Sequence, residues 1–251
     1  MTIEILSLRE RDLMRKAGRA AASTLAYVGA RLEPGMTTGA IDKLVREHTK
    51  LLGGRPSQLG YKGFPAAVCT SKNEIVCHGI PSDRVRLEEG DIVNVDVTTD
   101  LEGYHGDTSA TFLIGQVSPA ARALADLART ARDAGIRAAV AGGRLGDVGA
   151  AIVAHVGTGG SLVTDFGGHG IGRKMHLDPH VSHVSRAGTG PRLREGMAFT
   201  VEPMVNAGTA AIEHDSDGWT VRTADGRLSA QFEHTILITA NGPEITTLWE
   251  D

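Results

Sequence analysis

Two aspartates in one predicted hairpin are the first residues whose spacing suggests chemistry. Asp96 lies in NVDVT and Asp107 in HGDTS, and valines at every second position around Asp96 are typical of a half-buried β-strand. We expect the turn to be centred between Leu101 and Glu102. That register places the two carboxylates directly opposite each other, with Cβ atoms roughly 4.5–5.5 Å apart. Like charges at this separation repel, so the pair either shares a proton or binds a cation.

Two glutamates lie at mid-length in further predicted strands. Glu202 lies in MAFTVEPMV and is expected on the face of Thr200, and Glu233 lies in SAQFEHTILIT on the face of Gln231 and Thr235. Glutamate is almost never buried unless it is paired, and neither strand carries lysine or arginine. One shared proton cannot neutralise four carboxylates, so a bound cation becomes the better explanation.

His169 adds an imidazole to this set. It lies in GGHGIG, where the flanking glycines allow another group to approach the backbone closely. Four carboxylates and one imidazole suit Mn²⁺, Fe²⁺, Co²⁺ or a catalytic Zn²⁺ better than a structural zinc, which prefers thiolates. Because carboxylates can bridge, the set fits two metals roughly 3.5–4 Å apart, which would hold a hydroxide that attacks a carbonyl group.

Other catalytic arrangements are poorly represented. No G-x-S-x-G elbow, phosphate-binding loop or HExxH helix is present. Cys77 and His78 are adjacent on a predicted strand, so their side chains point to opposite faces and cannot form a dyad. His78 and His176 remain as candidate hydrogen-bond donors to a bound peptide.

Helices with apolar residues at helical spacing are predicted in two pairs. Ser7 and Glu10 form a capping box for the first helix, and Thr37 or Thr38 caps the second. The stretches LEPGMTTGAID and AGGRLGDVGAAI resemble each other, each joining a long helix to a shorter one. This favours a duplicated helix-helix-strands unit around one sheet. The predicted ranges are Ser7–Ala30, residues 37–53, Ser118–Ala141 and Leu145–Val156.

Strands are predicted around the candidate residues. A hairpin is expected within Gly60–His78, with its turn at Ser71–Asn73, before the hairpin of Asp91–Gly115. Continuous strands are expected over Met197–Val205 and Ser229–Thr239.

Composition excludes several functional classes. The 251 residues include 32 glycines, and the net charge is −4, which argues against nucleic acid as the main partner. Met1–Glu10 has neither the basic nor the apolar region of a signal peptide, and no apolar run could span a membrane. Cys69 and Cys77 are expected to be free thiols in a reducing cytoplasm.

Several short segments, spread along nearly the whole chain, resemble one peptidase family in their sequence and order. These segments, and the stretch AGR…LEPGMTTGAID near the N-terminus, are similar to type I methionine aminopeptidases in the short bacterial form. The segments are NEIVCHGIP at Asn73–Pro81, NVDVT at Asn94–Thr98, HGDTS at His105–Ser109, GHGIG at Gly168–Gly172, FTVEPM at Phe199–Met204 and SAQFEHT at Ser229–Thr235.

The resemblance implies a fold and a reaction. The fold would be the α+β pita-bread fold, a pseudo-two-fold antiparallel sheet covered by two helix pairs. Residues 1–251 would form one catalytic domain with halves at about 1–115 and 116–251. The reaction would be removal of the N-terminal methionine from nascent polypeptides with a small second residue, through attack of a metal-bridging hydroxide on the first peptide carbonyl.

The resemblance also assigns roles to residues. The ligands of two divalent metals (Co, Mn, Fe or Zn) would be Asp96, Asp107, His169, Glu202 and Glu233. Asp107 and Glu233 would bridge both ions, and Glu202 would also accept a proton. His78 and His176 would contact the substrate, with His176 polarising its carbonyl group.

The methionine pocket implied by the resemblance contains Tyr61, Phe64, Cys69, Met175 and Trp219, although ordinary core packing would use such residues equally well. Two positions depart from the family pattern: Met175 replaces a common aromatic residue, and Gln58 replaces a frequent cysteine. A monovalent cation is expected at the carbonyl groups of Asn73, Ile75 and Ser229.

Two alternatives remain. An X-Pro aminopeptidase or prolidase would share the fold and ligands, but usually carries an extra N-terminal domain and EPG where this chain has Glu202-Pro203-Met204. A catalytically dead binding module would have lost ligands. The expected setting is the cytoplasm, with a monomeric enzyme acting on nascent chains at the ribosome and no nucleic-acid or membrane partner.

Overall fold

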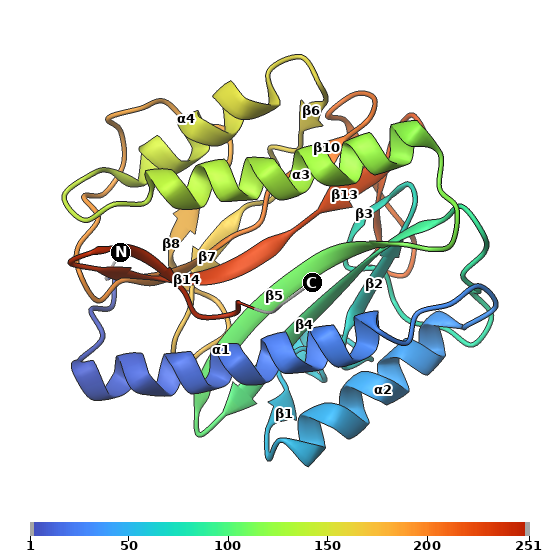
Figure 1. Ribbon diagram of the computed structural model, residues 1–251, viewed down its shortest axis with the longest axis horizontal. Coiled ribbons are helices and arrows are strands. Elements are labelled where there is room, and N and C mark those ends of the chain that lie inside the picture. Colours follow the sequence, from blue (N-terminus) through green and yellow to red (C-terminus); the bar gives the residue numbers. More distant parts are fainter. Residues whose placement is uncertain (1–2, 249–251) are drawn as a thin grey trace.

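Four α-helices form two pairs in the computed structural model, which describes residues 3–248 (Figure 1). They are α1 (Leu8–Gly29), α2 (Thr38–Leu51), α3 (Pro119–Ala138) and α4 (Leu145–Val156). Ser7 and Glu10 form the predicted capping box, Thr37 caps α2 and Ser118 caps α3. The four predicted helices are therefore confirmed, with α3 ending three residues early at Ala138.

The strands form one large and two small antiparallel sheets. The large sheet has the order β1-β4-β5-β14-β9-β7-β8, with β2 on β4 and β15 on β14; the small sheets are β13-β10-β6 and β11-β12-β3. The strand bounds are β1 (Arg55–Pro56), β2 (Cys69–Lys72), β3 (Ile75–Cys77), β4 (Ile92–Leu101), β5 (Tyr104–Leu113), β6 (Ser161–Leu162), β7 (Gly168–Gly170), β8 (Leu177–Val181), β9 (Ala198–Val201), β10 (Met204–Asn206), β11 (Ile212–His214), β12 (Val221–Thr223), β13 (Ser229–Gln231), β14 (Glu233–Thr239) and β15 (Gly242–Ile245), and a 3₁₀ turn covers Tyr61–Gly63.

The helices bury one face of the sheet and leave the other polar. Val93, Val95 and Val97 lie in the main apolar core with residues of all four helices, as their alternation predicts. Helix α1 crosses β5 closely at Gly106, where a Cβ atom would lie 2.5 Å from the backbone of Ala17. The opposite face carries the polar residues of β4 and β5. No helix within residues 3–248 is both long and apolar enough to cross a membrane.

The β4–β5 hairpin has a different register from the predicted one. Leu101 pairs with Tyr104, so Glu102 and Gly103 form the two-residue turn, with φ of 53° and 79°. A turn centred between Leu101 and Glu102 would have forced the bulky leucine to positive φ, where glycine is far less strained. Asp107 therefore pairs with Thr98 and Asp96 with Ser109. The prediction of directly opposed aspartates was wrong, because the two are diagonal neighbours on one face.

Two predicted strands are each interrupted. The strand expected over Met197–Val205 splits into β9 and β10 at Glu202-Pro203, because proline has no N–H to donate to a ladder. The strand expected over Ser229–Thr239 splits at Phe232 into β13, in a small sheet, and β14, in the large one. Each interruption places a glutamate beside the point where the chain changes sheets.

The predicted hairpin within Gly60–His78 was also wrong. β2 pairs with β4, whereas β3 pairs with β12 in a separate small sheet. The bend lies at Asn73, which has φ of 55° and whose side chain donates to Asp91 and accepts from the Ile92 N–H. Asparagine tolerates this left-handed conformation better than serine or lysine does.

Candidate metal centre

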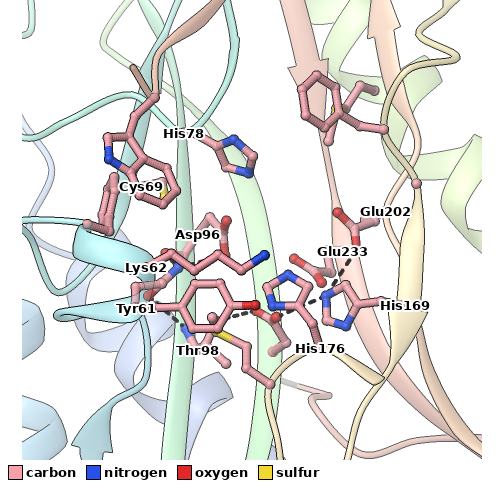
Figure 2. Close-up of a pocket in the computed structure, with 18 of the residues that line it drawn as sticks. Tyr61, Lys62, Cys69, His78, Asp96, Thr98, His169, His176, Glu202 and Glu233 are labelled. Atoms are coloured by element: carbon pink, nitrogen blue, oxygen red, sulfur yellow. Dashed lines mark hydrogen bonds and ion pairs between the residues drawn. The ribbon is translucent and has the colours of Figure 1, made fainter. Parts of the chain in front are cut away.

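The polar face of the large sheet brings together the five candidate ligands. Asp96 comes from β4, Asp107 from β5, His169 from β7, Glu202 from the break after β9 and Glu233 from the first position of β14. All five line one cavity of about 380 Å³. Figure 2 shows His169, Glu202 and Glu233 on one side of this cavity and Asp96 on the other.

Distances within the cluster match a metal site better than direct ion pairs. One ligand atom each of Asp107, His169 and Glu233 lies within 4.8 Å of the other two. His169 Nε2 is 3.6 Å from Asp107 Oδ2 and 3.7 Å from Glu202 Oε1, which is too far for a hydrogen bond. Donor atoms about 2.0–2.2 Å from one ion are separated by roughly 3–4 Å from each other, as these atoms are.

Neighbouring side chains orient the carboxylates. Thr98 Oγ1 donates to Asp107 Oδ1 at 2.7 Å. Thr200 Oγ1 donates to Glu202 Oε1 at 2.7 Å, and Gln231 Nε2 donates to Glu202 Oε2 at 3.2 Å. The predicted shared face of Glu202 and Thr200 is thus confirmed. Each carboxylate oxygen keeps a further lone pair for a cation.

Glu233 gives the sharpest indication of a missing partner. Its side chain is 2% exposed, and Oε1 has no hydrogen-bond partner among the described residues. A buried carboxylate oxygen without a partner is costly, and native proteins rarely leave one unsatisfied. A divalent cation would satisfy this atom, so the residues present fit the metal that the sequence predicts.

Electrostatics lead to the same conclusion. Burial raises the pKa of Asp96 and Glu233 well above their usual values, and the nearby Asp107 raises both further. Burial also raises the pKa of Glu202 to about 7. Burial on its own would lower the pKa of His169, but Asp107 and Glu202 raise it overall. The cluster therefore holds excess negative charge that protons or a cation must offset.

Two further histidines face the same cavity. The His176 ring stacks on Tyr61 with centroids 5.0 Å apart, and it lies against His169 in a tilted arrangement with centroids 4.1 Å apart. Burial, together with the charge of a protonated His169, lowers the pKa of His176 to about 4, so its ring is neutral at pH 7. His78 has a left-handed backbone with φ of 57°, and its ring lies edge-on to Phe166 and Trp219. Burial lowers the pKa of His78 as well.

An apolar wall adjoins the polar cluster. Phe64 and Trp219 pack edge to face with centroids 5.1 Å apart, and Cys69 lies in the same small apolar cluster. The structure places all five residues expected in the methionine pocket along the cavity, namely Tyr61, Phe64, Cys69, Met175 and Trp219. Both cysteines are buried free thiols, as predicted.

Sequence reasoning missed two supporting residues. His183 is 2% exposed, and its Nε2 accepts a hydrogen bond from the Glu202 N–H at 3.1 Å, just where Pro203 interrupts the ladder. Gln58 donates to the backbone carbonyl of Asp96 at 2.8 Å and accepts from the Thr98 N–H at 3.2 Å. Gln58 was noted only as a departure from the family pattern. Both residues come from loops, so no periodicity could have placed them.

Comparison with known proteins identifies the family. The profile of metallopeptidase family M24 matches residues 12–240. Methionine aminopeptidase A of Synechocystis sp. is 48% identical over 250 residues, which cover 99% of each chain. The chain belongs to family M24, within its methionine aminopeptidases. The methionine aminopeptidase of Escherichia coli K12 is 44% identical over 100% of this chain and 96% of the relative.

Solved structures of this family confirm the pita-bread fold. The crystal structure of methionine aminopeptidase from Rickettsia prowazekii matches with a TM-score of 0.96 and 44% identity, covering 98% of this chain and all of that one. Prolidase from Pyrococcus furiosus has a TM-score of 0.78 at 21% identity, and this chain covers only 66% of it. That second likeness concerns the fold alone, so the aminopeptidase assignment is favoured over the prolidase alternative. As an M24 metallopeptidase, the chain uses a divalent metal.

Protons should compete with the metal for these carboxylates. We expect the rise in unfolding temperature produced by Mn²⁺ to be larger at about pH 8 than at about pH 5.5. The raised pKa of Glu202, about 7, means that the metal-free fold keeps a proton that the ion must displace below pH 7. Each displaced proton weakens binding by about 1.4 kcal/mol per pH unit below that pKa.

Thermal unfolding with and without Mn²⁺ at both pH values measures this difference. His169, whose pKa is raised by Asp107 and Glu202, must also lose its proton to bind a metal, so it acts in the same direction. The Glu202→Gln variant, which has no carboxyl proton to displace there, should show a smaller pH dependence. An equal gain in unfolding temperature at both pH values in the unmodified protein would contradict the prediction.

Proposed function

We propose that this chain removes the N-terminal methionine from nascent polypeptides whose second residue is small. The observation that carries the proposal is the continuity of one cavity, in which a carboxylate and histidine cluster adjoins an apolar wall. Relatives named methionine aminopeptidase are 44–48% identical over nearly the whole chain. The cluster fits a hydrolytic metal site, and the wall fits an unbranched apolar side chain.

The ligand assignment follows from the five converging side chains. Asp96 and His169 would each hold one ion, Asp107 and Glu233 would bridge two, and Glu202 would complete the set. When bound, two divalent ions supply Lewis acidity and lower the pKa of water enough for hydrolysis near neutral pH. The unpartnered oxygen of Glu233 and the spacing around His169 support this arrangement.

Glu202 would accept the proton that hydrolysis releases and return it to the leaving amine. Its metal-free pKa of about 7 results first from burial, and Thr200 and Gln231 hold its two oxygens in place. His183 fixes its backbone. Once a metal has displaced that proton, the ionised carboxylate held in this position can take up a proton and give it back.

The two cavity histidines would act on the substrate amide. A neutral ring offers one N–H donor, and the low pKa of His176 keeps its ring neutral at pH 7. We assign His176 to the carbonyl oxygen of the scissile bond, where negative charge develops, and His78 to the peptide beyond it. Ring contacts with Tyr61, which is stacked, and with His169, which is tilted, hold the His176 ring at the edge of the cluster.

The apolar wall would select the methionine side chain. Phe64, Cys69 and Met175 are 3–6% exposed, so a ligand side chain would meet an almost dry surface. Sulfur and aromatic atoms pack favourably against a thioether, and Met175 can adapt its shape to one. Tyr61 and Trp219 would complete the pocket.

Further features of the proposal have indirect support. Ser229 Oγ is buried and has no hydrogen-bond partner among residues 3–248, and the Asn73 carbonyl accepts from the Ser229 N–H. A monovalent cation at the carbonyls of Asn73, Ile75 and Ser229 is therefore proposed. Each helix pair precedes strands that supply ligands, which supports one catalytic unit of two related halves. We also propose a monomer that works in the cytoplasm on chains leaving the ribosome.

Peptide specificity tests the proposed function. The purified chain, supplied with Mn²⁺ or Co²⁺, should release methionine from Met-Ala-Ser and leave Ala-Pro and Gly-Pro peptides intact, and a chelator should stop the release. Preferential cleavage of the proline peptides would establish the prolidase alternative. No cleavage of any of them with metal present would favour a binding module.

A further inference from the structure

Lys62 is held in a tight turn at the entrance of the cavity. Its backbone has φ of 49° and ψ of 26°, the left-handed region that costs an ordinary residue roughly 1–2 kcal/mol. Gly60 and Gly63 on either side also have positive φ, and the Gly60 N–H donates to the Phe64 carbonyl at 2.9 Å. Glycine or asparagine would fit this turn with less strain. Strain of this kind often accompanies a functional side chain.

The Lys62 side chain points into the cavity entrance. It is exposed but lines the cavity, and its Nζ lies 5.4 Å from the centroid of the Tyr61 ring. Figure 2 shows it extending past Tyr61, with its nitrogen beside His176. Its charge also contributes to the lowered pKa of His176, which places the ammonium group near the proposed donor to the scissile carbonyl.

The other lysines of the chain either form an ion pair or lie away from the cavity. Lys16, Lys43 and Lys72 each form an ion pair with an acidic side chain. Within residues 3–248 no ion pair of Lys62 is found, although five carboxylates line its cavity. Lys50 and Lys174 also have no ion pair in that part of the chain, but neither of them lines the cavity. Lys62 thus combines an unpaired charge with a position at the substrate entrance.

The position of the ammonium group indicates which part of a substrate it meets. The methionine side chain would occupy the wall of Phe64, Cys69 and Trp219, away from the entrance. Beyond the scissile bond, the second residue must be small under the proposed function and carries no charge. The third residue is the first one that can present a charged side chain at the entrance.

We propose that Lys62 binds an acidic side chain on the third residue of the substrate and so makes such polypeptides preferred substrates. This inference rests on the proposed aminopeptidase function. The other exposed charge that lines the cavity, Asp165, lies beside Phe166, whose ring contacts His78. Asp165 is therefore placed on the His78 side of the cavity, whereas the ammonium group of Lys62 lies beside His176.

Three amidated peptides, Met-Ala-Glu, Met-Ala-Gln and Met-Ala-Lys, test the inference with the metal-loaded enzyme. The ratio of kcat/KM for the glutamate peptide over the lysine peptide should be about two- to tenfold, since exposed charge pairs contribute modestly. The difference between the two peptides should appear mainly in KM. The ratio should fall toward one at about 1 M salt, where charges more than roughly 3 Å apart are largely screened from each other.

Variants locate the source of the preference. Lys62→Met should bring the ratio close to one, and Lys62→Glu should invert it. Lys174→Met, which removes a lysine that does not line the cavity, should leave the ratio unchanged. An unchanged ratio in Lys62→Met, or a preference of the unmodified enzyme for the lysine peptide, would overturn the assignment. Turnover of the glutamine peptide shows independently that the proposed function holds. If none of the three peptides is cleaved, both proposals fail.

Discussion

Replacing Asp107 with asparagine should abolish methionine release and lower the amount of divalent metal that the protein retains. Asp107 shares the cluster with His169 and Glu233 and is assigned to both ions. An amide is a far weaker ligand than a carboxylate, and it cannot supply the charge that neutralises two cations. The loss of kcat should exceed about 10³-fold, because a metal site acts as a unit whose members are not additive.

Metal content and stability separate this effect from misfolding. Elemental analysis after equilibration with Mn²⁺ should show less metal in Asp107→Asn than in the unmodified chain. The metal-free variant should unfold at the same or a higher temperature, because one buried charge leaves a group of four carboxylates. Asp165→Asn, on an exposed residue of the same cavity, should retain full metal content. Full metal content in Asp107→Asn would refute the ligand assignment.

Replacing His176 with alanine should lower kcat on the order of 10²–10³-fold while metal content stays unchanged. That range is the usual cost of removing one donor to a developing oxyanion. Among residues 3–248, His176 contacts the cluster through its ring against His169, and no hydrogen bond to its nitrogen atoms is found there. Because the interaction strengthens in the transition state, kcat should fall more than KM rises.

Steady-state kinetics and metal analysis together test this role. His176→Asn keeps a side-chain N–H donor and should recover part of the lost kcat, whereas a purely packing role against Tyr61 would be rescued better by His176→Phe. A near-normal kcat in His176→Ala, or loss of bound metal, would show that the residue has another role.

The helices and the ligand-bearing faces were accessible from sequence because both depend on local rules. Ser7 with Glu10 and Thr37 satisfy helix N–H groups within one turn, so the helix starts followed directly. Alternation along β4 placed Val95 on the face that the helices cover and Asp96 on the opposite face, where the other candidate ligands lie.

The register of the hairpin was not accessible in the same way. The midpoint of the predicted hairpin favoured a turn centred between Leu101 and Glu102. The observed turn uses Glu102 and Gly103, because both turn positions require positive φ and leucine would be strained there. This one-residue difference moved Thr98 opposite Asp107, and with it the hydroxyl group that orients that carboxylate. A small change in turn chemistry therefore altered the immediate environment of a ligand.

Contacts made by loops were beyond sequence reasoning for a different reason. His183 follows β8 and reaches Glu202 across the sheet, and Gln58 reaches Asp96 from the segment before the 3₁₀ turn. Neither segment has a repeating pattern, and each contact depends on where two distant parts of the chain pack. The sequence predicted which residues gather in the cavity but not which residues hold the proposed ligands in place.

The hydroxyl and amide groups that orient the carboxylates have a consequence for metal exchange. Thr98, Thr200 and Gln231 hold oxygen atoms of Asp107 and Glu202 in position without any ion. An incoming cation would then meet oxygen atoms already in position and would need little rearrangement of the chain. Carboxylate and imidazole donors accept several divalent ions, so the relative abundance of those ions would help to set which one occupies the site. Activity would therefore follow the supply of metal in its surroundings.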